Sequence, residues 1–278
     1  MSSSVEGMSA VDTGSLDTQA EPARSQVQGT ASFGKFMVVL QAIADAPGKL
    51  DIARLAKLLP YPRGTLYRIV TALLAEGLIA ESLDNGTYQL GHRLIHLASK
   101  SWETSDLRSV AREHIEALRN ATEETVHLAV PSGDGMVYID KLESPRTVGM
   151  MSRIGMRVEM HSTSVGKAYL AALPAEQCRA LIERLAMQPR TRNTITDADA
   201  LNADIQKTRA RGYSYDNEEN ESDIRCFGGV ILDRSGRPVG AVSLSIPLYR
   251  YDEARAGIFI EKVRDTVKAI SASLATIL

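Results

Sequence analysis

The two cysteines and two of the histidines are the side chains best suited to nucleophilic chemistry. Cys226 lies in an apolar stretch that predicts a strand, and His127 and His161 lie in or beside other predicted strands. An imidazole can activate a neighbouring thiol, so a cysteine-dependent redox enzyme is one hypothesis. No spacing signature joins these residues, and a buried structural cysteine is the favoured interpretation. Cys178 and Cys226 also lack the spacing of a disulfide framework or a zinc site.

Two further segments imitate catalytic motifs without completing them. Gly166-Lys167 is similar to the end of a phosphate-binding loop, which needs Gly five residues earlier and Ser or Thr afterwards. This chain has His161 and Ala168 at those positions. The acidic run 216–221 is similar to a calcium loop, but Glu221 stands where such a loop needs Gly. We therefore expect no metal and no cofactor.

The segment 162–167 favours ligand binding over catalysis. A predicted strand ends there and a helix begins, so free backbone N–H groups and the positive end of the helix dipole would attract a carboxylate. Ser243 and Ser245 offer hydroxyls on one side of another predicted strand. Asp216, at the end of a further strand, is a candidate for lining the pocket. Taken singly, each residue is more often structural, but together they suit a small organic acid.

A helix predicted to begin near Arg63 has one polar face. Its apolar residues recur at three- and four-residue intervals and form a buried stripe: Leu66, Ile69, Val70, Leu73 and Leu74. The opposite face and the first turn carry the residues that could contact DNA: Arg63, Gly64, Thr65, Tyr67, Arg68 and Thr71. Arginine can bond to a guanine edge or a phosphate, and threonine and a helix N-terminus can donate to phosphate oxygens. Alternatively, these are ordinary solvent-exposed residues.

Two shorter helices and a hairpin would position this helix. Apolar periodicity over residues 33–43 predicts a first helix, which Pro47-Gly48 ends. A second helix follows Asp51 and stops before Pro60. After the third helix, Asp84-Asn85-Gly86 predicts a tight turn between two short strands. This order predicts a winged helix-turn-helix, whose third helix can enter a major groove.

Length, composition and charge limit the other classes of protein. With 278 residues the chain exceeds one average domain, and its 44% hydrophobic and 24% charged residues are ordinary for a globular protein. A formal charge of -2 gives no general affinity for polyanions, so any nucleic-acid surface must be local. No apolar run is long enough for a membrane span and no signal-peptide pattern is visible, so a cytoplasmic location is expected.

The sequence predicts four parts. The first is a disordered tail at residues 1–31, and the second is the winged helix-turn-helix domain at residues 32–91. A helical linker follows at 92–105, and a second domain covers 106–278. Within the second domain, helices alternate with segments that predict strands: 126–130, 136–142, 147–151, 226–233 and 239–246. This pattern favours an α+β fold with an antiparallel sheet. The last helix could form a coiled coil, although packing on the sheet is favoured.

The chain resembles the IclR family of bacterial regulators over residues 32–276. In the first domain the similarity rests on 50–56, 65–70 and Tyr88-Gln89-Leu90-Gly91. In the second domain the matching segments are Glu124-Thr125-Val126-His127-Leu128, 161–168, 212–213, 216–219, Arg225-Cys226 and 240–245. Within the family, Tyr138-Ile139-Asp140-Lys141 and 151–155 are most similar in pattern to the ketodeoxygluconate repressor branch.

The resemblance implies a DNA-binding transcription regulator with a GAF-like effector-binding domain. Carried over position by position, the implied effector-binding residues are Met150, Val158, Ser164, Val165, Asp216, Cys226, Ser243 and Ser245. The branch implies a sugar-acid or 2-keto-acid effector. The family also implies a homodimer or tetramer that binds double-stranded DNA at a two-fold symmetric operator.

Two positions depart from the family pattern. Gly64 stands where the family usually has a serine before Thr65, which removes a hydroxyl that could hold a phosphate. Glu159 replaces a usual proline and could reshape the pocket wall. The operator sequence, the effector and the sign of regulation stay open, as does a winged helix that docks on protein instead of DNA.

Overall fold

The computed structural model describes residues 31–82, 84–103, 107–146 and 150–277. By its internal contacts the chain divides into two compact units, Met1–Ser99 and Lys100–Leu278. The expected disordered tail lies outside the described residues, except for Ala31, the first residue of the first helix. Within the described segments, no helix combines the length and apolar character needed to cross a membrane.

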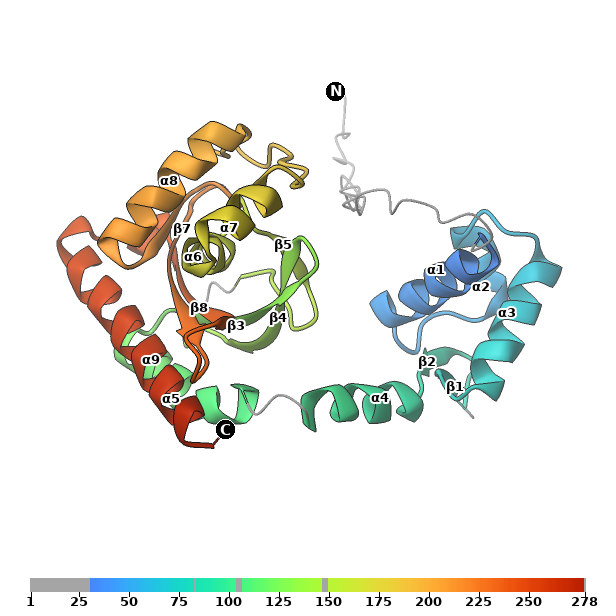
Figure 1. Ribbon diagram of the computed structural model, residues 1–278. Coiled ribbons are helices and arrows are strands. Elements are labelled where there is room, and N and C mark those ends of the chain that lie inside the picture. The colour runs from blue at the N-terminus through green and yellow to red at the C-terminus, as the bar shows by residue number, and fades with distance from the viewer. Residues whose placement is uncertain (1–30, 83, 104–106, 147–149, 278) are drawn as a thin grey trace, which may run out of the picture. The chain divides into compact units, whose positions relative to one another are not determined.

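The first unit is a three-helix core with a two-stranded antiparallel hairpin (Figure 1). Its elements are α1 (Ala31–Asp45), α2 (Ile52–Leu58), α3 (Arg63–Ala75), β1 (Ile79–Glu81) and β2 (Tyr88–Leu90). In the hairpin Ile79 pairs with Leu90, and an isolated bridge joins Leu50 to Tyr88. These elements are the expected winged helix-turn-helix.

Local chemistry sets the boundaries of these helices. The side chain of Asp51 accepts a hydrogen bond from the backbone N–H of Arg54, which caps the start of α2. Pro62 stands at the N-cap of α3, where its missing N–H costs nothing. Gly86 has a φ of 62°, in the left-handed region that the turn of the hairpin requires. The periodic stripe of α3 is buried as expected, with Leu66 fully so.

The second unit is built on one six-stranded antiparallel sheet with the order β5-β4-β3-β8-β7-β6. Its strands are β3 (Thr125–Ser132), β4 (Gly135–Leu142), β5 (Arg157–Glu159), β6 (Ser214–Asn217), β7 (Ile224–Leu232) and β8 (Pro238–Pro247). Chain-distant segments meet here, because β3 lies beside β8 with His127 opposite Ser243. The expected α+β fold with an antiparallel sheet is confirmed.

Helices cover both faces of this sheet (Figure 1). On one face pack α5 (Leu107–Thr122) and α9 (Ala256–Ile277), which share a core with apolar residues of β3, β7 and β8. On the other face lie α6 (Ser164–Ala172), α7 (Ala175–Ile182) and α8 (Ala198–Arg211), around a second core. The apolar stripe of α9 therefore packs on the sheet. The helix α4 (His92–Glu103) follows the hairpin, and two 3-10 turns, Leu248–Arg250 and Glu253–Arg255, precede α9.

The predicted set of strands needs three corrections, one strand too many and two too few. The expected strand at 147–151 is wrong where it can be tested, since Met150 and Met151 are not in a strand; residues 147–149 lie outside the described residues. The short strands β5 and β6 were not expected. They have three and four residues, which is too short for an alternating pattern to stand out from a loop.

Candidate nucleic-acid interface and ligand pocket

The exposed face of α3 carries the side chains that the sequence assigned to DNA. Arg63, Arg68 and Thr71 are exposed, and Tyr67 keeps 66% of its surface accessible. Thr65 in the first turn is half-buried. Among the described residues, neither Arg63 nor Arg68 has a hydrogen-bond or ion-pair partner. Both guanidinium groups are therefore available for contacts outside the chain.

The start of α3 also offers backbone donors and positive charge. Pro62 accepts from the N–H groups of Thr65 and Leu66, whereas the N–H groups of Arg63 and Gly64 have no acceptor among the described residues. Unpaired donors at a helix N-terminus bind phosphate readily. Residues 46–75 contain five Lys or Arg and one Asp, although the whole chain is close to neutral. The positive charge is thus local to the helix-turn-helix.

In the second unit, one face of the sheet carries two rows of polar side chains below α6. Asp216 pairs with Cys226, and Cys226 pairs with Ser245, whose hydroxyl lies 3.3 Å from the Cys226 Sγ. In the next row Ser243 stands opposite His127. All five residues are buried. The structure thus brings together four of the eight predicted effector residues, and it adds His127.

His127 connects this floor to the loop that follows β4. Its Nδ1 lies 3.4 Å from the hydroxyls of both Ser243 and Ser245, and its Nε2 lies 2.7 Å from the Ser152 hydroxyl. Burial, and then the nearby charge of Lys141, lower the pKa of His127 to about 3. The imidazole is therefore neutral at physiological pH, and it can donate at one nitrogen while it accepts at the other.

The other four predicted effector residues lie outside the two polar rows. Met150 contributes a carbonyl, which accepts a 2.7 Å hydrogen bond from the Lys141 ammonium. Val158 and Val165 belong to the apolar core under α6. The carbonyl of Ser164 accepts from the Ser214 hydroxyl at 2.6 Å.

The first turn of α6, which lies over the polar rows, has unpaired backbone N–H donors. Thr163 caps the helix by accepting from the Gly166 N–H at 3.2 Å. The N–H groups of Ser164 and Val165 have no acceptor among the described residues, and both residues are buried. Just before them, the Nδ1 of the buried His161 also lacks a partner in the described part of the chain. A ligand with an anionic group and hydroxyls would satisfy these atoms.

A buried ionic cluster lies beside the polar rows. The Lys167 Nζ is 2.7 Å and 2.8 Å from the two carboxylate oxygens of Glu219, and 3.0 Å from an oxygen of Asp204. Asp216 accepts a 2.7 Å hydrogen bond from the Glu219 N–H. Burial, followed by the negative charge of Glu219, raises the pKa of Asp216 to about 7. Asp216 therefore exchanges its proton near physiological pH.

The thiol chemistry required of a redox enzyme is not favoured by this environment. Burial, and then the charge of Asp216, raise the pKa of Cys226 well above its ordinary value, and burial also raises the pKa of Cys178. A reactive thiol needs the opposite shift, because the thiolate is the nucleophile. Among the described residues there is also no cluster of three side chains that could hold a metal ion.

Several residues of the pocket were missed as ligand-site candidates in the sequence. The sequence suggests a catalytic partner at His127 and gives no ligand-site signal for Tyr138, which stacks on His127 at 4.4 Å between ring centroids. Lys141 and Ser152 belong to segments of the family resemblance but carry no ligand-site signal of their own. His127 and Lys141 lie opposite each other because β3 pairs with β4, and Ser152 reaches His127 from the loop after β4; no local signal in the sequence marks these contacts.

Gly166 is expected to be essential for the close contact of α6 with the preceding segment. A Cβ at this position would lie 2.3 Å from the Met160 Cα, so Gly166→Ala must displace backbone. We expect a loss of about 1–3 kcal/mol in the free energy of unfolding, measured by urea titration. The matched control is Gly257→Ala in α9, where a Cβ would meet nothing within 4 Å. An unchanged urea midpoint for Gly166→Ala would contradict this packing.

A winged helix-turn-helix with a local positive charge, followed by a separate α+β unit that buries polar side chains and unpaired donors on one sheet face, is the arrangement of a DNA-binding transcription regulator. Comparison with known proteins agrees. The family described as "Bacterial transcriptional regulator IclR C-terminal" matches residues 99–272, and the "IclR helix-turn-helix domain" matches residues 34–82. The chain belongs to the IclR family of bacterial transcriptional regulators.

Individual relatives match over most of their length. The HTH-type transcriptional regulator KdgR of Escherichia coli K12 is 29% identical over 249 residues, which cover 90% of this chain and 94% of that protein. The crystal structure of the Thermotoga maritima IclR has a TM-score of 0.76 and 32% identity, covering 88% of this chain and 98% of that one. These relatives are transcriptional regulators, not enzymes.

A third comparison supports the fold alone. An IclR homologue from Microbacterium hydrocarbonoxydans, solved in complex with 4-hydroxybenzoate, has a TM-score of 0.72 at 22% identity, covering 88% of this chain and 100% of that one. KdgR regulators of Escherichia coli K12 and Dickeya chrysanthemi are among these relatives, each 29% identical over most of the chain.

Proposed function

We propose that this regulator binds a two-fold symmetric operator through α3, and that a small organic acid in the second unit changes its affinity for that operator. The observation that carries the proposal is the buried polar floor of Asp216, Cys226, Ser243 and Ser245, together with the unpaired N–H groups of the first turn of α6. Buried donors without partners are costly unless a ligand or water satisfies them.

A sugar acid or a 2-keto acid is the proposed effector class. A carboxylate suits the N–H groups of Ser164 and Val165, while hydroxyl or keto oxygens suit the serines and the neutral imidazole of His127. The ligand of the related Microbacterium hydrocarbonoxydans structure is also an organic acid. The eight predicted effector residues and the DNA-contacting residues of α3 remain part of this proposal.

DNA binding through α3 is tested by Arg68→Ala. Loss of a guanidinium that contacts a base or a phosphate should weaken operator binding about 5- to 150-fold, since such contacts contribute roughly 1–3 kcal/mol. A gel-shift titration on the DNA upstream of the protein's own gene measures this. The matched control is Arg234→Ala, an exposed arginine in the turn before β8, which should bind like the wild type.

This variant also separates DNA binding from docking on protein. If Arg68→Ala keeps its fold by circular dichroism and still binds the upstream DNA with wild-type affinity, α3 does not read DNA, and the protein-docking alternative is favoured.

The acid site is tested by a thermal-shift panel of sugar acids and 2-keto acids, followed by a gel shift with each hit. The double variant Ser243→Ala/Ser245→Ala should weaken binding of a hit about tenfold, because it removes two neutral hydrogen bonds to the ligand, each of which contributes about 0.5–1.5 kcal/mol. Ser235→Ala, an exposed serine in the turn after β7, is the control. Absence of stabilisation by every acid would refute the pocket.

A homodimer or larger assembly is proposed because a two-fold operator needs two recognition helices. On α4, Ile95 and Leu97 expose 71% and 52% of their surface, which suits contact with a second copy. We propose that the effector acts through the helices of residues 94–120 on the spacing of the two copies of α3. A change of less than about twofold in operator affinity at saturating effector would be too small for this coupling.

A further inference from the structure

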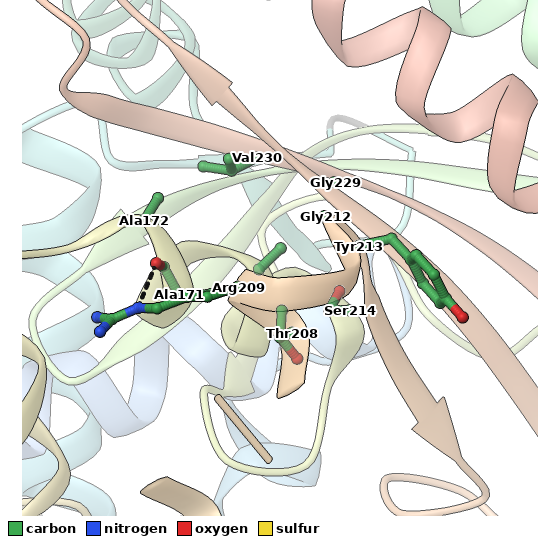
Figure 2. Close-up of a pocket in the computed structure, with 11 residues that line it drawn as sticks. Ala171, Ala172, Thr208, Arg209, Gly212, Tyr213, Ser214, Gly229 and Val230 are labelled. Carbon is green, nitrogen blue, oxygen red and sulfur yellow. Dashed lines mark hydrogen bonds between the residues drawn. The ribbon is translucent and has the colours of Figure 1, made fainter. Parts of the chain in front are cut away.

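A cavity lies on the second unit where α6 and α8 end against β7 (Figure 2). Its volume is about 220 Å³. None of the eight predicted effector residues lines it. It is therefore distinct from the effector site proposed over the polar rows, which does not account for it.

The cavity exists because β6 is shorter than its neighbour. β6 begins at Ser214, opposite Gly228, whereas β7 continues to Leu232. Beyond Gly228 no strand pairs with the outer edge of β7 in the described part of the sheet. The residues that cover this edge are small, with Ala171 and Ala172 at the end of α6 and Gly212 at the end of α8. The space left between them is not filled by side chains.

The walls combine apolar surface with one positive charge. Ala171, Ala172 and Val230 supply methyl groups, and in Figure 2 the ring of Tyr213 points away from the other labelled side chains. Arg209 is the one charged residue among those that line the cavity. A positive charge without a lining carboxylate favours an anion by charge complementarity.

The guanidinium of Arg209 is held in a fixed position. Its Nε donates to the Ala171 carbonyl at 2.8 Å, the dashed line in Figure 2, and its Nη2 donates to the Leu173 carbonyl at 2.9 Å. Its Nη1 has no hydrogen-bond partner among the described residues. Because the other two nitrogens are anchored to the end of α6, the guanidinium is fixed before any ligand binds and keeps one donor unused.

We propose that this cavity is a second small-molecule site, which binds a compact carboxylate with an apolar body. The apolar body occupies the space between Ala172 and Val230, and the carboxylate pairs with Arg209. An engineered apolar cavity of about 150 Å³ holds benzene, so 220 Å³ is sufficient for a molecule of the size of benzoate.

The site is positioned to communicate with the effector pocket. Ser214 lines the cavity, and its hydroxyl donates to the carbonyl of Ser164 in the first turn of α6. A Cβ on Gly228, also in the lining, would lie 2.4 Å from the Ser214 Oγ and 2.7 Å from the Ser164 carbonyl oxygen. The two sites thus share one tightly packed wall.

The test is calorimetric titration of the full chain with benzoate and hexanoate, and with the neutral benzamide and hexanamide. We expect at least one acid to bind at least tenfold more tightly than its amide. Ala172→Leu should fill the space and weaken the binding of that acid at least tenfold. Ala254→Leu, at an exposed position before α9, should leave the binding unchanged. Failure of both acids to bind, or unchanged binding to Ala172→Leu, overturns the proposal.

A second measurement does not depend on the variant folding. In the wild-type chain with labelled alanine and valine methyl groups, the bound acid should show nuclear Overhauser contacts to Ala171, Ala172 and Val230. Contacts to Val158 and Val165 instead would place the acid in the effector pocket and overturn the second site.

Discussion

Replacing Lys167 with methionine should lower the free energy of unfolding by about 3–5 kcal/mol, the usual cost of leaving a buried charge without its partner. The Lys167 side chain is 1% exposed and the Glu219 side chain 8%, so water cannot replace the lost ammonium. Methionine keeps most of the volume and removes the charge together with the hydrogen bonds that the ammonium donates to Glu219. The measurement is the urea midpoint of the full chain at pH 7.

The double variant Lys167→Met/Glu219→Gln is the matched control. It removes the cation together with the carboxylate that faces it at 2.7 Å and 2.8 Å, so it should recover a substantial part of the lost stability. The single variant Glu219→Gln gives the cost of that change in free energy of unfolding. If the double variant falls below Lys167→Met by this same amount, the two side chains are not coupled and the cluster does not stabilise the fold.

Loss of the cluster should also affect the ligand pocket. The Glu219 N–H donates to Asp216, and the Thr194 hydroxyl donates to the Glu219 carbonyl at 2.7 Å. Lys167 thus ties the loop after β6 to α6 through Glu219 and to α8 through Asp204, next to the polar rows. Thr194 joins the same loop to the segment before α8. We infer that Lys167 positions the pocket and does not contact the effector.

Asp216 should make the stability of the second unit fall as the pH rises. Its pKa is about 7 in the folded chain, against an ordinary value of 3.8. Between these values the folded state keeps a proton that the unfolded state has released, so stability is lost from about pH 4 up to about pH 7 and then levels off. The difference between these two pKa values sets an upper limit of about 4 kcal/mol on the stability lost.

Comparison with Asp216→Asn isolates this effect, because asparagine is similar in shape and does not titrate. The wild type should lose stability relative to Asp216→Asn between pH 4 and pH 8, as measured by urea unfolding at each pH. Asp233→Asn is a control of opposite sign, since hydrogen bonds from the Arg237 backbone and side chain lower the pKa of Asp233. Parallel pH profiles for wild type and Asp216→Asn would show that Asp216 stays ionised in the folded chain.

The first unit could be predicted closely because its signals are local. The spacing of Leu66, Ile69 and Val70 marks the buried side of α3, and the exposed side then follows from the geometry of a helix. Asp51 caps α2, and Gly86 turns the hairpin, through bonds and dihedral angles within a few residues. No distant contact is needed to recognise these features.

The pocket could be predicted only in part. Candidate residues such as Ser164, Asp216 and Cys226 came from the family resemblance and from the start of a predicted helix. Lys167 looked like part of an incomplete phosphate-binding loop. Its actual partners, Asp204 and Glu219, lie 37 and 52 residues further along the chain, and no motif connects them.

Sequence alone therefore determined the helix-turn-helix, the α+β class and the exposed face of the helix proposed to contact DNA, since hydrophobic periodicity and capping act over a few residues. Tertiary structure decided which polar side chains share a pocket. Cross-strand register places Asp216, Cys226 and Ser245 in one row and brings His127 from over a hundred residues away to Ser243. A shift of one residue in that pairing would turn these side chains to the opposite face.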